Sequence, residues 1–373
     1  MRSLQTTGVV MAILTLPCSG MTYAGAWQSA VALPMTVEHD SNPLLLTSDE
    51  KAITRTIIAP DYTLVGNFDR DQWKFGLGVN VERSSDTDVV SNREDPRLSF
   101  GWQRETEKGG YGLTARYIES STLSTEVQQT GVTDSTDGTQ KLSNIGGNWR
   151  SAVTERSSLV DEIDLTHVEY DTASLTNYDE LTNRLSWLYQ WNERVELFTR
   201  FEATRYEPKD DTSTLGSSNS YTPVVGVNYQ ISERFTGSVY GGMNKVSNSN
   251  SGPTGQGGVS LRYTGERVET NAEASRSTIA NGENGLVESD ELRGNWSYLL
   301  DETSRVGVDG SWQKTKGDAP STFRTYGAFV SRELSPFWLA RLSFTYKERE
   351  RDGLPNADAN IIGMTLIYSH PDF

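Results

Sequence analysis

Charged residues stand at alternate positions in many segments of this sequence, with apolar residues between them. Since neighbouring residues of a strand point to opposite faces of a sheet, such segments have one apolar face and one polar face. Each charge would cost several kcal/mol in a dry protein core, and a water-filled lumen removes that cost. We therefore predict a polar lumen of mixed sign lined by Lys74, Glu82, Arg97, Arg116, Glu162, Asp164, Arg184, Arg200, Glu202, Arg262, Glu269, Glu273 and Arg293.

Few residues could catalyse a reaction or hold a metal ion. The candidates are the histidines and some of the aspartates, namely His39, His167, His370, Asp134, Asp137, Asp210 and Asp211. No two histidines have metal-ligand spacing, and the aspartates lie in loop-like sequence, where aspartate is common. His167 could act as a general base beside a serine, as in a lipase-type barrel, but a single strand histidine is far more often incidental. We expect no metal site, no cofactor and no enzymatic activity.

Length, composition and hydropathy are compatible with a membrane barrel. The chain has 373 residues, of which 35% are hydrophobic, and a mean hydropathy of −0.54. A transmembrane barrel needs apolar residues on only one face of each strand, so its average hydropathy resembles that of a soluble protein. The formal net charge of −16 argues against nucleic acid as a partner.

Residues 1–26 have the features of a secretory signal peptide. Arg2 is the charged start, residues 9–16 form a short apolar core, and residues 24–26 form a small-residue cleavage site. Cys18 is the one cysteine of the sequence, so cleavage would leave no disulfide, thiolate metal site or cysteine nucleophile. We expect secretion across the inner membrane, with residues 27–373 forming one domain in the bacterial outer membrane.

From residue 27 onward the sequence alternates with period two, and short breaks alternate with longer ones. This pattern is typical of antiparallel hairpins arranged up and down. We predict an all-β fold, a single antiparallel up-and-down transmembrane β-barrel of about 18 strands, with 16 strands as the alternative. Aromatic residues cluster near the short turns, as Trp187 and Trp191 do, which favours an interfacial girdle. The break at residues 122–139 is the longest candidate for a loop that plugs the bore.

The last segment, residues 360–373, alternates up to the end of the sequence and needs a partner for its edge. Pairing with the first strand would close the barrel. Gly363, Leu366, Tyr368 and Phe373 resemble the C-terminal signal by which outer-membrane barrels are recognised for insertion. We therefore expect outer-membrane lipid and the barrel assembly machinery as partners.

Residues 38–43 read Glu-His-Asp-Ser-Asn-Pro, and short turns with Glu-Arg recur at residues 154–156, 192–194 and 232–234, with 301–303 as a variant. In these features and in hairpin length, the chain resembles the outer-membrane β-barrel porin families found with bacterial exopolysaccharide operons. The resemblance implies a channel that exports a secreted polysaccharide, delivered by a periplasmic polysaccharide export protein. Passage would be passive, with arginines and carboxylates of the lumen hydrogen-bonding sugar hydroxyls transiently.

Two other functions remain open from the sequence. A general or solute-specific diffusion porin would use the same barrel for small molecules. A barrel enzyme or a surface adhesin would depend on the loops more than on the bore.

Overall fold

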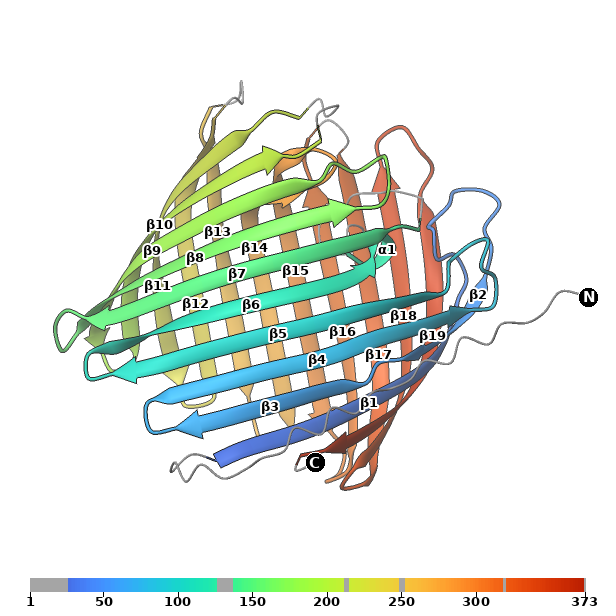
Figure 1. The fold of residues 1–373 in the computed structure, drawn as a ribbon, viewed down its shortest axis with the longest axis horizontal. Helices are drawn as coiled ribbons and strands as arrows, with labels where there is room; N and C mark the ends of the chain where they lie inside the picture. The colour runs from blue at the N-terminus through green and yellow to red at the C-terminus, as the bar shows by residue number, and fades with distance from the viewer. Residues whose placement is uncertain (1–25, 126–136, 211–214, 248–251, 318–319, 372–373) are drawn as a thin grey trace, which may run out of the picture.

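The computed structural model describes residues 26–125, 137–210, 215–247, 252–317 and 320–371, which form one antiparallel sheet closed into a barrel (Figure 1). The predicted signal peptide therefore lies outside the described residues, except for Ala26. The elements in chain order are β1 (Ala26–Asp40), β2 (Ile53–Ile58), β3 (Asp61–Phe68), β4 (Asp71–Ser84), β5 (Arg93–Thr106), β6 (Gly109–Ser121), α1 (Thr122–Thr125), β7 (Thr139–Ala152), β8 (Ser157–Tyr170), β9 (Tyr178–Asn192), β10 (Val195–Pro208), β11 (Ser218–Ser232), β12 (Phe235–Val246), β13 (Thr254–Thr264), β14 (Val268–Asn281), β15 (Gly285–Leu299), β16 (Ser304–Thr315), β17 (Ser321–Ser335), β18 (Trp338–Arg351) and β19 (Ala357–His370).

The elements β2 and β3 are two halves of one strand. Both pair with β1 in a single register, in which Met35 lies opposite Ile58 and Ala32 lies opposite Asp61. The interruption falls at Pro60, which has no N–H to donate to the ladder. Within the described residues the barrel thus has 18 strands, which confirms the predicted fold and shows that the alternative of 16 is wrong.

The last strand closes the barrel. β19 pairs with β1 from Val31 opposite His370 to Asp40 opposite Ile361, so neither strand keeps an open edge. This confirms the predicted pairing of the first and last strands.

The predicted insertion signal lies on this closing strand. Gly363, Leu366 and Tyr368 belong to β19, whereas Phe373 lies outside the described residues. The ring of Tyr368 packs 5.1 Å from that of Trp338 in the neighbouring strand. Recognition of these residues during insertion stays a prediction.

The short turns at residues 154–156, 192–194 and 232–234 and the variant at 301–303 are each held by the side chain of their first residue. Asn192 Oδ1 accepts the N–H groups of Arg194 and Val195, at 2.9 and 3.0 Å. Asp301 Oδ1 accepts those of Thr303 and Ser304, each at 2.8 Å. A side-chain oxygen that accepts backbone donors two and three residues later stabilises a tight turn, which explains why Thr, Asn, Ser or Asp opens each one.

The outer face of the wall is apolar. Large side chains such as Leu77, Ile145 and Met364 are more than half exposed there, at 57%, 57% and 62%. Near the short turns this face carries aromatic pairs, including Trp73 with Trp102 at 5.7 Å between ring centroids. An apolar band with an aromatic girdle is the surface that outer-membrane barrels present to lipid. No described helix is long and apolar enough to cross a membrane.

If lipid contacts this outer face, a charge placed there should destabilise the barrel far more than the same charge placed inside. Leu98 is 48% exposed, and its neighbour Ser99 points to the other face. We expect Leu98→Arg to lower the free energy of unfolding in lipid vesicles by about 2–4 kcal/mol and Ser99→Arg by about 1 kcal/mol or less. Urea unfolding followed by tryptophan fluorescence measures both, and equal losses would contradict the assignment of faces.

The hydrogen bonds to Asp301 make the stability of this turn depend on pH. The N–H and hydroxyl of Thr303 donate to the carboxylate and lower the pKa of Asp301 to about 2. Because the pKa of Asp301 is lowered, its carboxylate stabilises the turn fully above pH 3.8, the ordinary value. This stabilisation is lost as the pH falls through about 2. An NMR titration of the Thr303 amide should give a midpoint near pH 2, and a midpoint near 4 would contradict it.

Candidate functional site

The predicted lumen residues lie on the face of each strand that is opposite to the exposed apolar side chains. In β4, Lys74 and Glu82 alternate with Phe75 and Leu77, which are on the outer face. The same alternation places the others on the inner face, namely Arg97 in β5, Arg116 in β6, Glu162 and Asp164 in β8, Arg184 in β9, Arg200 and Glu202 in β10, Arg262 in β13, Glu269 and Glu273 in β14, and Arg293 in β15. That this face conducts solutes stays a prediction.

Some of these residues meet in one cavity of about 710 Å³ along the inner face of β13–β18. Arg262, Glu273 and Arg293 line it together with Asp309 and Lys347, which the sequence prediction did not include. The remaining wall includes the polar residues Asn271, Ser311 and Thr325 and the apolar residues Leu261 and Phe323. Such a surface offers hydrogen-bond donors and acceptors of both signs to a hydrated solute.

A second group of predicted residues forms a ladder of ion pairs across β8, β9 and β10. Glu162, Arg184 and Glu202 lie directly opposite one another on these three strands. Arg184 Nε lies 2.8 Å from Glu202 Oε2, and its Nη1 lies 3.3 Å from Asp164 Oδ2. One arginine therefore serves several carboxylates, and these side chains are about a third exposed, which limits each pair to about 1 kcal/mol or less.

Glu82 belongs to a third group, centred on Arg55 of β2. Arg55 Nη1 lies 3.1 Å from Glu82 Oε1, its Nη2 contacts Glu38, and Asp40 Oδ2 is 3.7 Å from Nη2. The sequence prediction missed Arg55, Glu38 and Asp40, although Glu38 and Asp40 fall in the segment 38–43. The group ties the interrupted strand β2 to both of its neighbours, β1 and β4.

The loop between β1 and β2 folds onto the inner wall. Asn42 is buried, and its Nδ2 donates to Leu46 O at 2.9 Å and to Asp358 O at 3.0 Å, while its Oδ1 accepts the N–H of Leu46 at 2.9 Å. This holds Leu45, with a φ of 49°, in an apolar cluster with Phe323 of β17 and with Ala357 and Ala359 of β19. The polar run at residues 38–43 thus anchors a loop inside the barrel mouth.

The loop between β4 and β5 and the base of the loop between β6 and β7 also pack against the wall. Val89 and Val90 are buried with Ile53 of β2. Arg93 Nη1 lies 3.4 Å from Asp137 Oδ1 and 3.2 Å from the carbonyl oxygen of Gly138. Most of the predicted plug at residues 122–139 lies outside the described residues, but its two ends are fixed at the wall.

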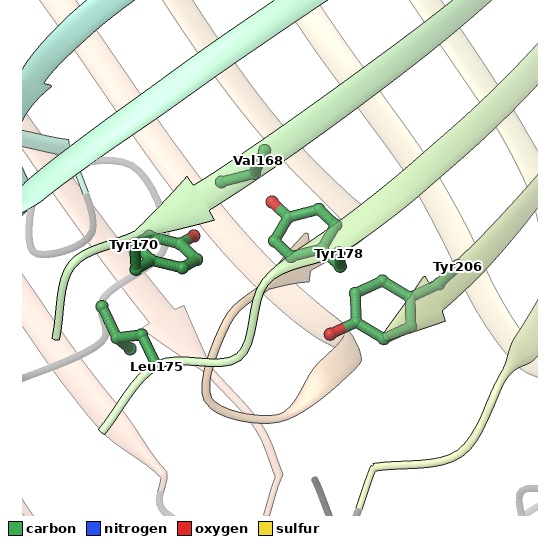
Figure 2. Close-up of a cluster of buried hydrophobic side chains, with 5 residues drawn as sticks. All are labelled: Val168, Tyr170, Leu175, Tyr178 and Tyr206. Carbon is green, nitrogen blue, oxygen red and sulfur yellow. The ribbon is translucent and has the colours of Figure 1, made fainter. Parts of the chain in front are cut away.

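The tip of the β14–β15 hairpin folds into the barrel at the mouth where the long loops lie. Its tip packs against an apolar cluster of Val168, Tyr170, Leu175, Tyr178 and Tyr206, drawn in Figure 2. The Tyr206 hydroxyl donates to Asn281 O at 3.4 Å, and the Thr176 N–H donates to Gly282 O at 2.8 Å. A cavity of about 240 Å³ separates the hairpin from the Arg184 ladder on the inner wall, so the hairpin lies inside the barrel.

Three inward-folded segments therefore surround the loop-side mouth. They are residues 41–52, residues 85–92 and the tip of the β14–β15 hairpin at residues 279–287. In the hairpin tip, Glu283 lies 3.7 Å from Arg351 of β18. These segments make the mouth narrower than the opening that the strands alone would form.

Among the described residues considered for catalysis or metal binding, His167 and Asp210 make other contacts. His167 is on the outer face of β8, where Nδ1 lies 2.6 Å from Asp179 Oδ1 and Nε2 lies 3.1 Å from Glu169 Oε1, so neither nitrogen serves a serine. Asp210 accepts hydrogen bonds from Asn177 at 2.8 and 3.0 Å. Asp134 and Asp211 lie outside the described residues. In the described part of the chain, no group of three or more His, Cys, Asp or Glu side chains could hold a metal ion.

Some inner-face residues that the sequence prediction missed could have been found from the alternation of polar and apolar residues. In β18, Arg341, Lys347 and Arg349 alternate with Leu342 and Phe344, which are exposed on the outer face. The same period of two therefore places these cations inside. Arg55 had no such signal, because β2 is short and interrupted.

Comparisons with known proteins support the fold. No protein-family model and no curated protein sequence matches the chain. Among solved structures, OccAB4 of Acinetobacter baumannii is similar with a TM-score of 0.55 and 9% identity, over 92% of this chain and 98% of that chain. OccAB2 of the same organism gives 0.51 and 7% over 92% and 98%, and OpdQ of Pseudomonas aeruginosa gives 0.50 and 9% over 92% and 99%.

The chain therefore shares the β-barrel fold of these solved structures. At identities this low the likeness concerns the fold alone. Nothing in these comparisons ties the chain to exopolysaccharide operons.

The role of Asn42 in the mouth is testable. Asn42→Ala removes the three hydrogen bonds that hold residues 41–46, and we expect a loss of about 1–3 kcal/mol in the free energy of unfolding and a larger single-channel conductance. Asn148→Ala, on the exposed inner wall of β7, is the matched control and should change neither value. Unfolding and planar-bilayer recordings measure both, and an unchanged conductance in Asn42→Ala would contradict the proposed narrowing.

Proposed function

We propose that this protein is an outer-membrane channel for the passive diffusion of small hydrophilic solutes. The observation that carries the proposal is the combination of a charged, solvent-accessible inner wall with a mouth narrowed from several sides. The inner wall supplies Arg262, Glu273, Arg293 and Asp309 to one cavity. Charges of both signs along a hydrated path favour transient hydrogen bonding of solutes over a single deep site.

The narrowed mouth supports small solutes over a polymer. The hairpin tip joins the wall near Tyr206 to the wall near Arg351, through Asn281 and Glu283. A polysaccharide leaving the cell would have to pass these contacts along its whole length. The prediction of polysaccharide export, drawn from a sequence resemblance, has no comparable support, and the porin-like neighbours favour the diffusion alternative.

The size limit of the channel tests this proposal directly. Vesicles containing the full refolded chain should swell rapidly in arabinose and much more slowly in the tetrasaccharide stachyose. Empty vesicles serve as the control. Equal swelling rates in both sugars, or a deletion strain that stops secreting its polysaccharide, would favour export instead.

The ion-pair ladder makes a second prediction for the same channel. Arg184→Gln leaves Asp164 and Glu202 without their cation, so we expect the K⁺/Cl⁻ permeability ratio to rise by roughly twofold. Glu202→Gln, the matched change on the partner, should lower that ratio. Reversal potentials under a KCl gradient give both ratios, and shifts of the same sign in the two variants would contradict the placement of the ladder in the conducting path.

A further inference from the structure

Four neighbouring strands each place a charged side chain on the wall of the 710 Å³ cavity, with signs that alternate from strand to strand. These residues are Arg262 of β13, Glu273 of β14, Arg293 of β15 and Asp309 of β16. In the register of the strands, Glu273 lies directly opposite Arg293, and Arg262 is its diagonal neighbour on the other side. Diagonal neighbours on one face of a sheet are about 7–8 Å apart, so one small solute can contact both.

Three of these four charges have no counterion in the wall. Arg262, Glu273 and Asp309 are exposed, and none of them forms an ion pair with any described residue. Arg293 differs, because its Nε contacts the carboxylate of Glu291 on the same face of β15. Arg262 and Glu273 therefore present a positive and a negative group side by side to a solute in the cavity.

Elsewhere on the inner wall, charges of opposite sign are already joined. Arg184 Nε lies 2.8 Å from Glu202 Oε2 on the wall of β9 and β10. Arg305 Nη1 lies 2.9 Å from Glu269 Oε2, between β16 and β14. A charged solute would have to break such a pair before it could form its own, whereas no pair has to be broken at Arg262.

We propose that Arg262 and Glu273 bind a small zwitterion, a solute with an ammonium group and a carboxylate a few bonds apart. This inference rests on the proposed function, because it names the class of solute that the channel would hold. The guanidinium of Arg262 presents paired N–H donors to the two oxygens of the solute carboxylate. The carboxylate of Glu273 accepts hydrogen bonds from the ammonium group.

Neutral and singly charged solutes fit this wall less well. A neutral solute would displace water from both charges and neutralise neither. A simple anion bound at Arg262 would have Glu273 as a like-charged diagonal neighbour, and a simple cation at Glu273 would meet the reverse. Four molecules of matched size separate these cases at pH 7, since β-alanine is a zwitterion, β-alaninamide a cation, propionate an anion and propionamide neutral.

Ligand-observed NMR on the full chain, refolded in detergent, measures the dissociation constant of each probe without any transport. We expect the wild type to bind β-alanine at least about fivefold more tightly than the other three probes. Arg262→Gln and Glu273→Gln should each raise the dissociation constant of β-alanine about tenfold, as expected when a charge-assisted hydrogen-bonding partner is lost. The matched controls Arg116→Gln and Glu196→Gln remove inner-face charges of β6 and β10 that do not line this cavity, and should keep the wild-type value.

The two variants should also differ in the singly charged probe that they prefer. Arg262→Gln keeps the acceptor and should favour β-alaninamide over propionate, whereas Glu273→Gln keeps the donor and should favour propionate. A purely structural role of these residues would not give opposite preferences. Exchange of the two residues, Arg262→Glu with Glu273→Arg, keeps one charge of each sign and should bind β-alanine within about threefold of the wild type.

Several results would overturn the proposal. They are a wild type that binds the four probes equally or does not bind β-alanine, the same probe preference in both single variants, and an exchange variant that binds β-alanine no better than the single variants.

The two proposals can fail separately. Selective binding of β-alanine by a protein that admits no solute into vesicles would leave the site standing and remove the channel function. A channel that passes arabinose but shows no preference for β-alanine would do the reverse.

Discussion

The structure depends on one constraint, which is that the two faces of every strand meet different solvents. In hydrocarbon no water satisfies an open backbone N–H or C=O group, so a spanning sheet must close on itself. The pairing of β1 with β19 meets this requirement. The apolar outer face and the charged inner face then follow from a period of two, since the same alternation that exposes Leu77 to the outside turns Lys74 to the inside.

A different principle organises the mouth. The described loops and strand ends that fold inward bury apolar side chains against each other, as a small soluble core does. Leu45 meets Phe323, Val90 meets Ile53, and the β14–β15 hairpin meets Tyr206. Polar side chains such as Asn42 then fix the backbone of these loops. The result is a polar inner wall with a narrow, partly apolar entrance.

The sequence predicted the parts of this structure that depend on local periodicity. Strand number, closure by the last strand, the girdle near the short turns and the inner-face positions from Lys74 to Arg293 all follow from alternation. The structure of the mouth does not follow from alternation. Its contacts join residues far apart in the chain, such as Leu45 and Phe323, and a local sequence pattern does not predict such contacts. Phe323 and Tyr206 also break the simple rule of a polar inner face, since each belongs to a cluster that closes the mouth. Arg349 could have been placed on the inner face from the alternation in β18, whereas its position opposite Phe323 depends on the register of neighbouring strands.

The most direct test of the account is an accessibility map of one strand in intact outer membranes. Without residues 1–26 the chain has no cysteine, so single cysteines can be introduced along β8 and labelled with a small water-soluble maleimide. The account predicts that cysteines at Glu162 and Asp164 react and that cysteines at Ile163 and Leu165 do not, because the first pair faces water and the second faces lipid. Equal labelling of all four positions, or labelling of Ile163 and Leu165 alone, would contradict the central claim that water fills the barrel and hydrocarbon surrounds it.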